Sequence, residues 1–215
     1  MSIDRTRHWD EVYRTRHEDA LSWYETSPDI ALDFVARMGL APDDPIVDVG
    51  TGLSRLPDRL LALGYGDVTL VDVSAEAIAR GNDRRRAAGL GPAEGLTAVV
   101  GDVTAWRPQP RYRLWHDRAV LHFLVGDEER TAYRRVLEAA VVPGGHALIA
   151  TFAPDGPERC SGLAVRRYGA EDLGTFLGPT FGLVGSRTFD HVTPGGAVQR
   201  FHVGWLQRRA DGGAR

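Results

Sequence analysis

Residues 46–56, IVDVGTGLSRL, contain an acid and two glycines at a spacing typical of a ligand-binding loop. Asp48 ends a short apolar run, and Gly50 and Gly52 follow it, where small residues let backbone approach a ligand. A dinucleotide loop needs a third glycine at position 55, and this chain has Arg55 there. A carboxylate beside the loop would also repel a pyrophosphate. Unless the two glycines are ordinary turn residues, the pattern favours a ligand with a positive centre and no phosphate.

The elements that must position this loop are indicated by apolar runs that alternate with helical patterns. Strand-like runs are at residues 45–49, 67–73, 96–103, 112–120 and 144–152. Helical patterns are at residues 4–17, 27–39, 54–64, 74–89, 126–141 and 169–178. This alternation predicts a mostly parallel sheet with helices on both faces. Two final runs, 181–192 and 197–209, are separated by the turn TPGG and predict an antiparallel hairpin.

The composition narrows the possible functions. The 215 residues suit one domain, and a net charge of -3 gives no reason to expect a nucleic-acid or membrane partner. All 26 basic residues are arginines, which excludes a P-loop lysine and Schiff-base chemistry. The histidines are scattered, so no metal site is expected, and the single cysteine fits a reducing cytoplasm. The arginine run 84–86 is expected to lie on a solvated helix face.

Five elements in order make the sequence resemble the class I, seven-stranded methyltransferases that use S-adenosylmethionine. These elements are residues 48–52, Asp72, residues 101–103, residues 115–124 and the VVPGG turn at 141–145. The resemblance covers nearly the whole chain. It implies an α/β, Rossmann-like, doubly wound and mostly parallel seven-stranded sheet, with a C-terminal antiparallel hairpin and helices on both faces.

The resemblance also implies S-adenosylmethionine as the cofactor and suggests which residues hold it. Asp72 would accept hydrogen bonds from both ribose hydroxyls, and Asp102 would hold the adenine amino group. Alternatively, Asp72 could cap the next helix, although Ser74 suits that position better, and Asp102 could be an ordinary turn residue. The expected cofactor-binding residues are Trp9, Asp48, Gly50, Thr51, Gly52, Asp72, Val73, Asp102, Val103 and Asp117.

Methyl transfer requires that the acceptor is aligned and that water is excluded, and a general base is needed only if the acceptor keeps a proton. His122 and Asp117 are therefore the candidate catalytic residues, although a histidine at a helix edge can equally be structural. Arg118 could clamp an anionic acceptor or merely pair with Asp117. The expected acceptor-binding residues are Tyr13, Trp23, Arg118, His122, Cys160, Arg167 and Tyr168.

We therefore expect a single methyltransferase domain over residues 1–215. Residues 1–40 would form a helical lid, residues 41–151 the cofactor-binding core, and residues 152–215 the acceptor loop, a helix and the hairpin. The function expected is methyl transfer to an oxygen, nitrogen or sulfur atom of a small molecule in the cytoplasm, by a monomer or a homodimer.

Two alternatives stay open. A protein lysine methyltransferase shares the G-x-G-x-S-x-L run and an aromatic N-terminus, but the segment 152–168 departs from protein-modifying members. A non-catalytic module could also have kept the cofactor site.

Overall fold

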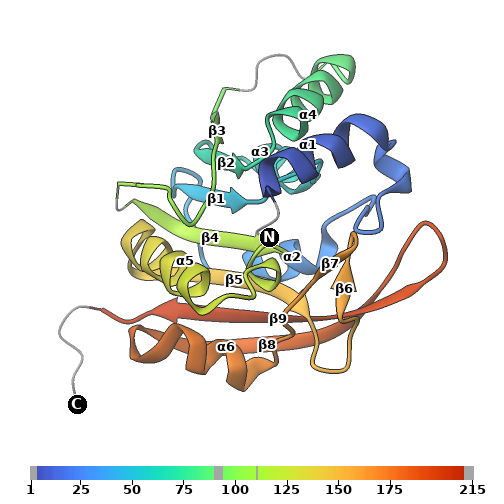
Figure 1. Ribbon diagram of the computed structural model, residues 1–215. Coiled ribbons are helices and arrows are strands. Elements are labelled where there is room, and N and C mark those ends of the chain that lie inside the picture. Colours follow the sequence, from blue (N-terminus) through green and yellow to red (C-terminus); the bar gives the residue numbers. More distant parts are fainter. Residues whose placement is uncertain (1–3, 90–93, 110, 211–215) are drawn as a thin grey trace.

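The computed structural model describes residues 4–89, 94–109 and 111–210, which form a seven-stranded sheet with the order β3-β2-β1-β4-β5-β9-β8 (Figure 1). The first five strands in this order are parallel, and β9 and β8 are antiparallel. The strands are β1 Ile46–Val49, β2 Val68–Asp72, β3 Leu96–Val100, β4 Tyr112–Arg118, β5 Val141–Phe152, β8 Phe181–Val192 and β9 Val198–Arg208. The predicted Rossmann-like fold with its terminal hairpin is therefore confirmed.

Helices cover both faces of the sheet, as predicted. The helices are α1 Arg5–Thr15, α2 Asp29–Val35, α3 Leu56–Ala62, α4 Ala75–Ala87, α5 Asp127–Ala140 and α6 Ala170–Leu177. Short 3₁₀ turns are η1 Glu18–Ala20, η2 Leu121–Phe123 and η3 Gly178–Thr180, and a small hairpin joins β6 Arg159–Cys160 to β7 Leu163–Ala164. No helix in the described part of the chain combines the length and the apolar character needed to span a membrane.

The central strands are short apolar runs because both of their faces are covered. Every residue of β1 and β2 is buried. Along β4, Leu114 packs in the core under α2 and α3, and its neighbour Trp115 packs in the opposite core under α5 and α6. Since side chains alternate along a strand, this order decides which face each polar residue of β4 reaches.

Helix α2 is shorter than the sequence predicts. It was expected over residues 27–39 with Ser27 as its cap, but it runs only from Asp29 to Val35. The Ser27 hydroxyl donates to the Asp29 carboxylate at 2.5 Å instead of receiving a helix amide, and Pro28 occupies the cap position. The chain continues in turns to Gly39, which has a positive φ of 65°.

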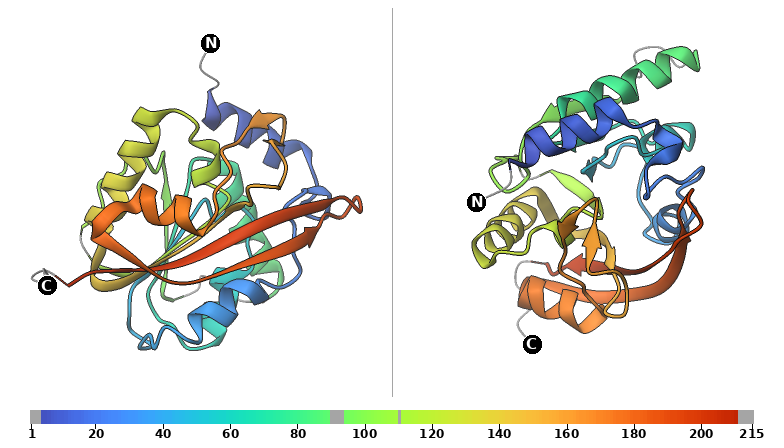
Figure 2. Two further views of the ribbon diagram at one scale, coloured as in Figure 1. Left: turned by 90° about the horizontal axis from the view of Figure 1, so that it is seen from below. Right: turned by 45° about the vertical axis from the view of Figure 1, so that its right-hand side comes forward.

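The terminal hairpin extends beyond the strand it pairs with. Strands β8 and β9 pair from Phe181 and Arg208 to Val192 and Val198, whereas β5 pairs with β9 only as far as Phe201. The far end of the hairpin curves toward the N-terminal segment (Figure 2), where His191 Nε2 lies 2.9 Å from the Ser22 carbonyl oxygen. This curvature brings β9 to the edge of the sheet where parallel strands end.

Candidate functional site

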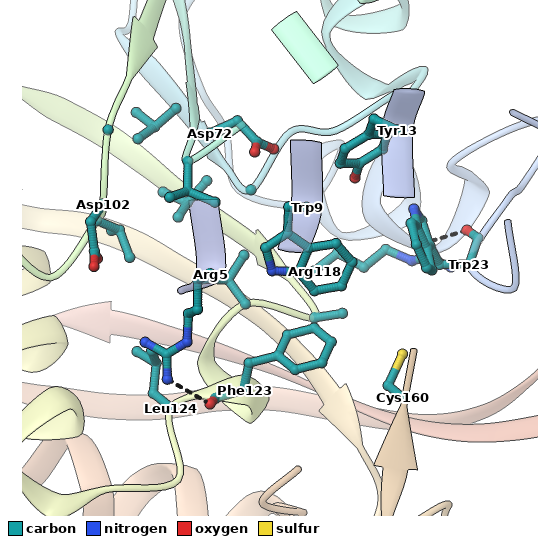
Figure 3. A pocket seen from close by; sticks show the side chains of 18 of the residues that line it. Arg5, Trp9, Tyr13, Trp23, Asp72, Asp102, Arg118, Phe123, Leu124 and Cys160 are labelled. Atoms are coloured by element: carbon teal, nitrogen blue, oxygen red, sulfur yellow. Dashed lines mark hydrogen bonds between the residues drawn. The ribbon is translucent and has the colours of Figure 1, made fainter. Parts of the chain in front are cut away.

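A pocket lies at the carboxyl ends of β1, β2, β3 and β4. The chain leaves β1 toward β2 on one side and returns to β4 on the other, so this edge is the topological switch point where ligands of such sheets bind. The pocket has about 910 Å³ of empty space, including its open mouth. Asp102 lies at one end and Cys160 at the other (Figure 3). Its wall includes Val49, Gly50, Val71, Asp72, Val73, Gly101, Asp102, Val103, Ala119 and Val120.

The glycine loop is packed so closely that it accepts no side chain. Gly50 and Gly52 have φ values of 62° and 49°, which glycine adopts without strain. A Cβ atom on Gly50 would overlap with the Val120 side chain, and one on Gly52 would overlap with the Tyr13 hydroxyl. Both glycines are therefore favoured by backbone conformation and by the close approach of Val120 and Tyr13.

Asp72 presents a buried carboxylate to the pocket. It ends β2, and its two oxygens accept hydrogen bonds from the backbone N–H groups of Gly52 at 2.7 Å and Ser74 at 2.8 Å. Burial raises the pKa of Asp72 to about 6, and the nearby Asp48 carboxylate adds to this shift, while the two N–H donors oppose it. Within the described residues no arginine or histidine pairs with Asp72, so a cationic ligand would relieve an unfavourable burial.

The expected adenine-binding residues lie at the opposite end of the pocket from Cys160. The Asp102 carboxylate accepts hydrogen bonds from the backbone N–H and the hydroxyl of Thr104, both at 2.8 Å, and the residue is exposed. Val73 and Val103 provide apolar walls on either side. Asp102 is therefore both a turn residue, through its hydrogen bonds to Thr104, and a residue of the pocket wall.

Asp48 faces a smaller cavity next to this pocket, together with Thr51 and Gly52. Its carboxylate accepts a hydrogen bond from the Thr51 hydroxyl at 2.8 Å, and its other oxygen lies 2.6 Å from His116 Nδ1. His116 was not predicted as a site residue. It lies on the same face of β4 as Leu114, two residues earlier, and β4 pairs with β1 so that His116 is opposite Asp48.

The aromatic N-terminal segment closes one side of the pocket. Trp9 meets Trp23 and Phe123 edge to face, with ring centroids 5.6 and 5.1 Å apart. Tyr13 is buried beside the glycine loop. Arg5 donates to the Phe123 carbonyl oxygen at 3.1 Å and pairs with Glu129 at 2.7 Å, which fixes the start of α1 to the start of α5.

The Cys160 end of the pocket is built by segments that are distant in sequence. The Arg118 guanidinium donates to the Trp23 carbonyl oxygen at 2.9 Å and pairs with Glu25 at 3.2 Å, so it does not pair with Asp117 as one alternative expected. Gln199 and Phe201 of β9 complete this wall. Burial raises the pKa of the Cys160 thiol to about 11, which keeps it protonated at neutral pH.

Asp117 and His122 do not line the pocket. Asp117 is fully buried on the α5 face of β4, where it accepts hydrogen bonds from Val120 N, Leu121 N and the Tyr133 hydroxyl. His122 is also fully buried and packs against Phe123 and Phe152, and burial lowers its pKa to about 3. Both were predicted as catalytic residues, but strand alternation turns Asp117 away and the η2 turn buries His122.

Arg167 and Tyr168 also lie outside the pocket. Arg167 donates to the Gly156 carbonyl oxygen at 3.1 Å and pairs with Glu158 at 3.3 Å, and the Tyr168 hydroxyl accepts a hydrogen bond from Arg130 at 3.1 Å. They face a separate, polar depression between α5 and α6. The chain turns after β7, so only Cys160 of the predicted acceptor loop reaches the pocket.

The prediction of a solvated arginine run is wrong for two of its three members. Arg85 is buried and pairs with Asp58 at 2.5 Å. Arg84 donates to the Leu53 and Ser54 carbonyl oxygens at 2.7 and 3.0 Å, so it holds the loop that follows Gly52. Only Arg86 is exposed. These acceptors lie about 30 residues away in the sequence, so the local pattern could not reveal them.

Several wall residues of the pocket were missed, among them Arg5, Gln199 and Phe201. Arg5 could have been found, because it is four residues before Trp9 and therefore on the same helix face. Gln199 and Phe201 carry no such signal, since their place in the wall depends on the curvature of the hairpin.

Comparisons with known proteins agree with this geometry. Residues 46–145 match the family model described as a methyltransferase domain. The eEF1A lysine and N-terminal methyltransferase of Mus musculus is 24% identical over 130 residues, which are 60% of this chain and 18% of that protein. The chain therefore covers less than a fifth of the length of this relative.

Solved structures match over nearly the whole chain. One, from work on the conversion of a disulfide bond into a thioacetal group during echinomycin biosynthesis, has a TM-score of 0.74 and 24% identity, and the match covers 96% of this chain and 94% of that one. Another is the 1,6-didemethyltoxoflavin-N1-methyltransferase of Burkholderia thailandensis with its acceptor and S-adenosylhomocysteine bound. It has a TM-score of 0.66 and 21% identity, over 95% of this chain and 84% of that one. The matched residues 46–145 contain the glycine loop and the acids of the pocket, so the similarity to a methyltransferase domain falls on the part of the chain that builds this site.

Proposed function

We propose that the protein binds S-adenosylmethionine in the pocket at the switch point and transfers its methyl group to an oxygen, nitrogen or sulfur atom of a small molecule. The observation that carries this proposal is the buried Asp72 carboxylate beside a glycine loop that no Cβ atom could occupy. A buried anion without a cationic partner suits a cationic ligand with hydroxyl donors.

The residues of the pocket fit this cofactor. Asp72 would accept hydrogen bonds from the ribose hydroxyls, and Asp102 would accept one from the adenine amino group. Val73 and Val103 would enclose the adenine ring, and the loop at Gly50 and the neighbouring Asp48 would hold the amino-acid part. The bound cofactor supplies an electrophilic methyl group on a positively charged sulfur.

The protein's own contribution is alignment and the exclusion of water. Trp9, Trp23 and Phe123 form an apolar wall over the pocket. A closed apolar site strengthens electrostatic interactions and keeps the acceptor in line with the methyl group. We therefore assign the N-terminal segment the role of the lid that was expected over residues 1–40.

A small acceptor is favoured over a lysine side chain by the chemistry of the wall. A lysine ammonium must lose a proton before it can attack, which requires a base nearby. At the Cys160 end, the described wall residues include no carboxylate, and the raised pKa values of Cys160 and Tyr13 keep both groups protonated. Glu25 faces the neighbouring cavity and pairs with Arg118.

Protein lysine methylation is the second candidate, and the similarity to the eEF1A lysine and N-terminal methyltransferase favours it. Incubation with tritium-labelled S-adenosylmethionine and cell extract, followed by separation by size, distinguishes the two. We expect label in the small-molecule fraction. Label in the protein fraction would support lysine methylation. Cofactor binding in calorimetry without label in either fraction would support a non-catalytic module.

Several expectations about the whole protein belong to this proposal. We propose one domain with a lid, a cofactor-binding core over residues 41–151 and an acceptor-facing part over residues 152–215. A cytoplasmic location, a monomeric or homodimeric state and the lack of nucleic-acid and membrane partners are proposed with it. The ends of that domain, residues 1–3 and 211–215, lie outside the described residues.

A further inference from the structure

The Cys160 end of the pocket has walls made of aromatic rings. Trp9 comes from α1, Trp23 from the segment after η1, and Phe123 from η2. All three line the pocket and are only partly buried. Trp9 meets His8, Trp23 and Phe123 nearly edge to face, at 86°, 82° and 70°, and its ring is tilted by 38° to that of Tyr13. Each of the three rings keeps part of its surface exposed to the pocket, so a flat molecule has aromatic surface on which to stack.

The same end of the pocket is electrically neutral. The charged groups in this part of the described wall are arginines, and each has a carboxylate partner: Arg118 pairs with Glu25, and Arg5, which is bonded to the Phe123 carbonyl oxygen, pairs with Glu129. Cys160 and Tyr13 stay protonated because burial raises the pKa of each. A charged acceptor would therefore lose its hydration here and find no free counter-charge.

Gln199, which lines the pocket, has a buried side-chain oxygen, Oε1, without a hydrogen-bond partner in the described part of the chain. The Gln199 amide can present either its oxygen or its nitrogen after a flip, so it suits one polar substituent on the acceptor.

We infer that the acceptor is an uncharged, planar heteroaromatic molecule that receives the methyl group on a pyridine-type ring nitrogen. This inference rests on the function proposed above and specifies its acceptor. Such a nitrogen has a free lone pair at neutral pH, so it needs no general base. At the Cys160 end, the described wall residues offer aromatic surface and no carboxylate base, which matches that requirement.

The transfer balances without any proton. The lone pair of the ring nitrogen forms the new N–CH₃ bond, while the S–CH₃ bond breaks and its electron pair stays on sulfur. The sulfonium becomes a neutral thioether, and the acceptor ring takes the positive charge. Trp9 and Trp23 can stabilise a delocalised cation in this position because the faces of aromatic rings carry negative potential.

Binding of defined probes tests the inference. The protein is first titrated with S-adenosylhomocysteine by calorimetry, and failure to bind would contradict the proposed function itself. The loaded protein is then titrated with quinoline, isoquinoline and Nα-acetyl-lysine amide while tryptophan fluorescence is followed. We expect both heteroaromatic probes to quench the fluorescence and the lysine derivative to have no effect. Loaded protein that binds neither quinoline nor isoquinoline at millimolar concentration would overturn the inference.

Turnover with S-adenosylmethionine gives a second readout by mass spectrometry. We expect N-methylated quinolinium or isoquinolinium and no methylated lysine derivative. A methylated lysine derivative as the only product would overturn the inference while leaving the cofactor assignment intact.

Variants locate the binding surface. Trp23→Leu should weaken quinoline binding about tenfold, and Trp23→Phe should restore most of it, because stacking needs an aromatic face rather than tryptophan itself. Trp205→Leu is the matched control, since Trp205 lies in β9 outside the pocket and packs against Phe34 of α2. An equal loss in Trp23→Leu and Trp205→Leu, or no rescue by Trp23→Phe, would contradict stacking on Trp23.

Discussion

At the scale of single residues, the site depends on carboxylates that are buried before any ligand arrives. Removing a carboxylate from water is unfavourable unless hydrogen bonds or opposite charges compensate it. Asp48 has a hydroxyl and an imidazole as partners, whereas the partners of Asp72 among the described residues are two backbone N–H groups. Asp72 is therefore the residue at which a cationic ligand gains most.

Replacing Asp72 by asparagine should weaken S-adenosylmethionine binding by about ten- to a hundredfold in calorimetry, because a charged hydrogen-bond acceptor is lost. The pKa of Asp72 is raised to about 6, so its carboxyl is neutral below that pH and ionised above it. Wild-type affinity should accordingly rise between about pH 5 and pH 7, and the variant should lack this rise. Asp83→Asn, on the exposed face of α4, is the control and should bind like the wild type.

The fit of Gly52 against Tyr13 predicts a coupled pair of substitutions. Gly52→Ala should destabilise the protein by about 1–3 kcal/mol, because alanine is strained at positive φ and its Cβ atom meets the Tyr13 hydroxyl. In the Tyr13→Phe background the same change should cost less, since the obstructing oxygen is gone. The free energy of unfolding is measured with urea. If Gly52→Ala lowers it equally in the wild type and in Tyr13→Phe, the overlap between the new Cβ atom and the Tyr13 hydroxyl does not matter.

At the scale of elements, helix α1, for which we propose the role of a lid, is held by polar contacts along its length. Its start is fixed through Arg5, and its middle through Asp10, which accepts hydrogen bonds from the Ser74 hydroxyl at 2.6 Å and from Glu76 N at 3.3 Å. Arg80 of α4 donates to the carbonyl oxygens of Tyr13 and Arg16 near its end. These contacts are few compared with those of the sheet, so α1 can open separately.

Asp10→Ala should therefore release α1 without unfolding the sheet. We expect faster amide hydrogen exchange in residues 5–15 and weaker cofactor binding, with exchange in β1 and β4 unchanged. Glu11→Ala is the matched control, because Glu11 is the exposed neighbour and its side chain contacts only Arg14. Faster exchange throughout the sheet in Asp10→Ala would mean that α1 belongs to the core.

At the scale of the whole molecule, one buried polar network joins three elements across the sheet. The Trp115 indole donates to the Tyr133 hydroxyl at 3.0 Å, and that hydroxyl donates to Asp117 at 2.6 Å. Asp117 in turn holds the N–H groups of Val120 and Leu121. The network connects β4, α5 and the η2 turn, so it shapes the pocket although none of these polar side chains faces it.

Tyr133→Phe should lower the free energy of unfolding by about 1–3 kcal/mol, because it leaves the buried Trp115 indole N–H without its acceptor and removes one of the hydrogen bonds to Asp117. Burial raises the pKa of Asp117 to about 6 in the folded state, so folding is disfavoured increasingly as pH rises from about 4 to 6. The Tyr133 hydrogen bond opposes that shift, and its loss should raise the pKa further. The deficit of the variant should therefore be larger at pH 8 than at pH 4.

The control for this network is Tyr112→Phe. Tyr112 is also buried in β4, but its hydroxyl bonds to the neutral Thr69 hydroxyl at 3.1 Å. Its removal should cost a similar free energy at both pH values in denaturant unfolding. If Tyr133→Phe also lost the same free energy of unfolding at pH 4 and at pH 8, this would contradict ionisation of Asp117 in the folded protein.

The sequence by itself determined the fold and the ligand edge of the sheet. Apolar runs and helical periodicity are local signals, and they predicted the strands to within a few residues. Parallel strands end at the same edge, so Gly50, Asp72 and Asp102 could be grouped at one site before any distance was known. The spacing of Trp9 and Tyr13, four residues apart, similarly indicated one helix face.

Only the tertiary structure decided which neighbouring residues reach the pocket. Asp117 and Arg118 are adjacent in sequence, yet strand alternation sends one to α5 and the other to the pocket wall. Gln199 and Phe201 join that wall because the terminal hairpin curves over it. Such placements depend on register, twist and contacts between distant segments, and these are properties of the packed chain that no local pattern of residue types encodes.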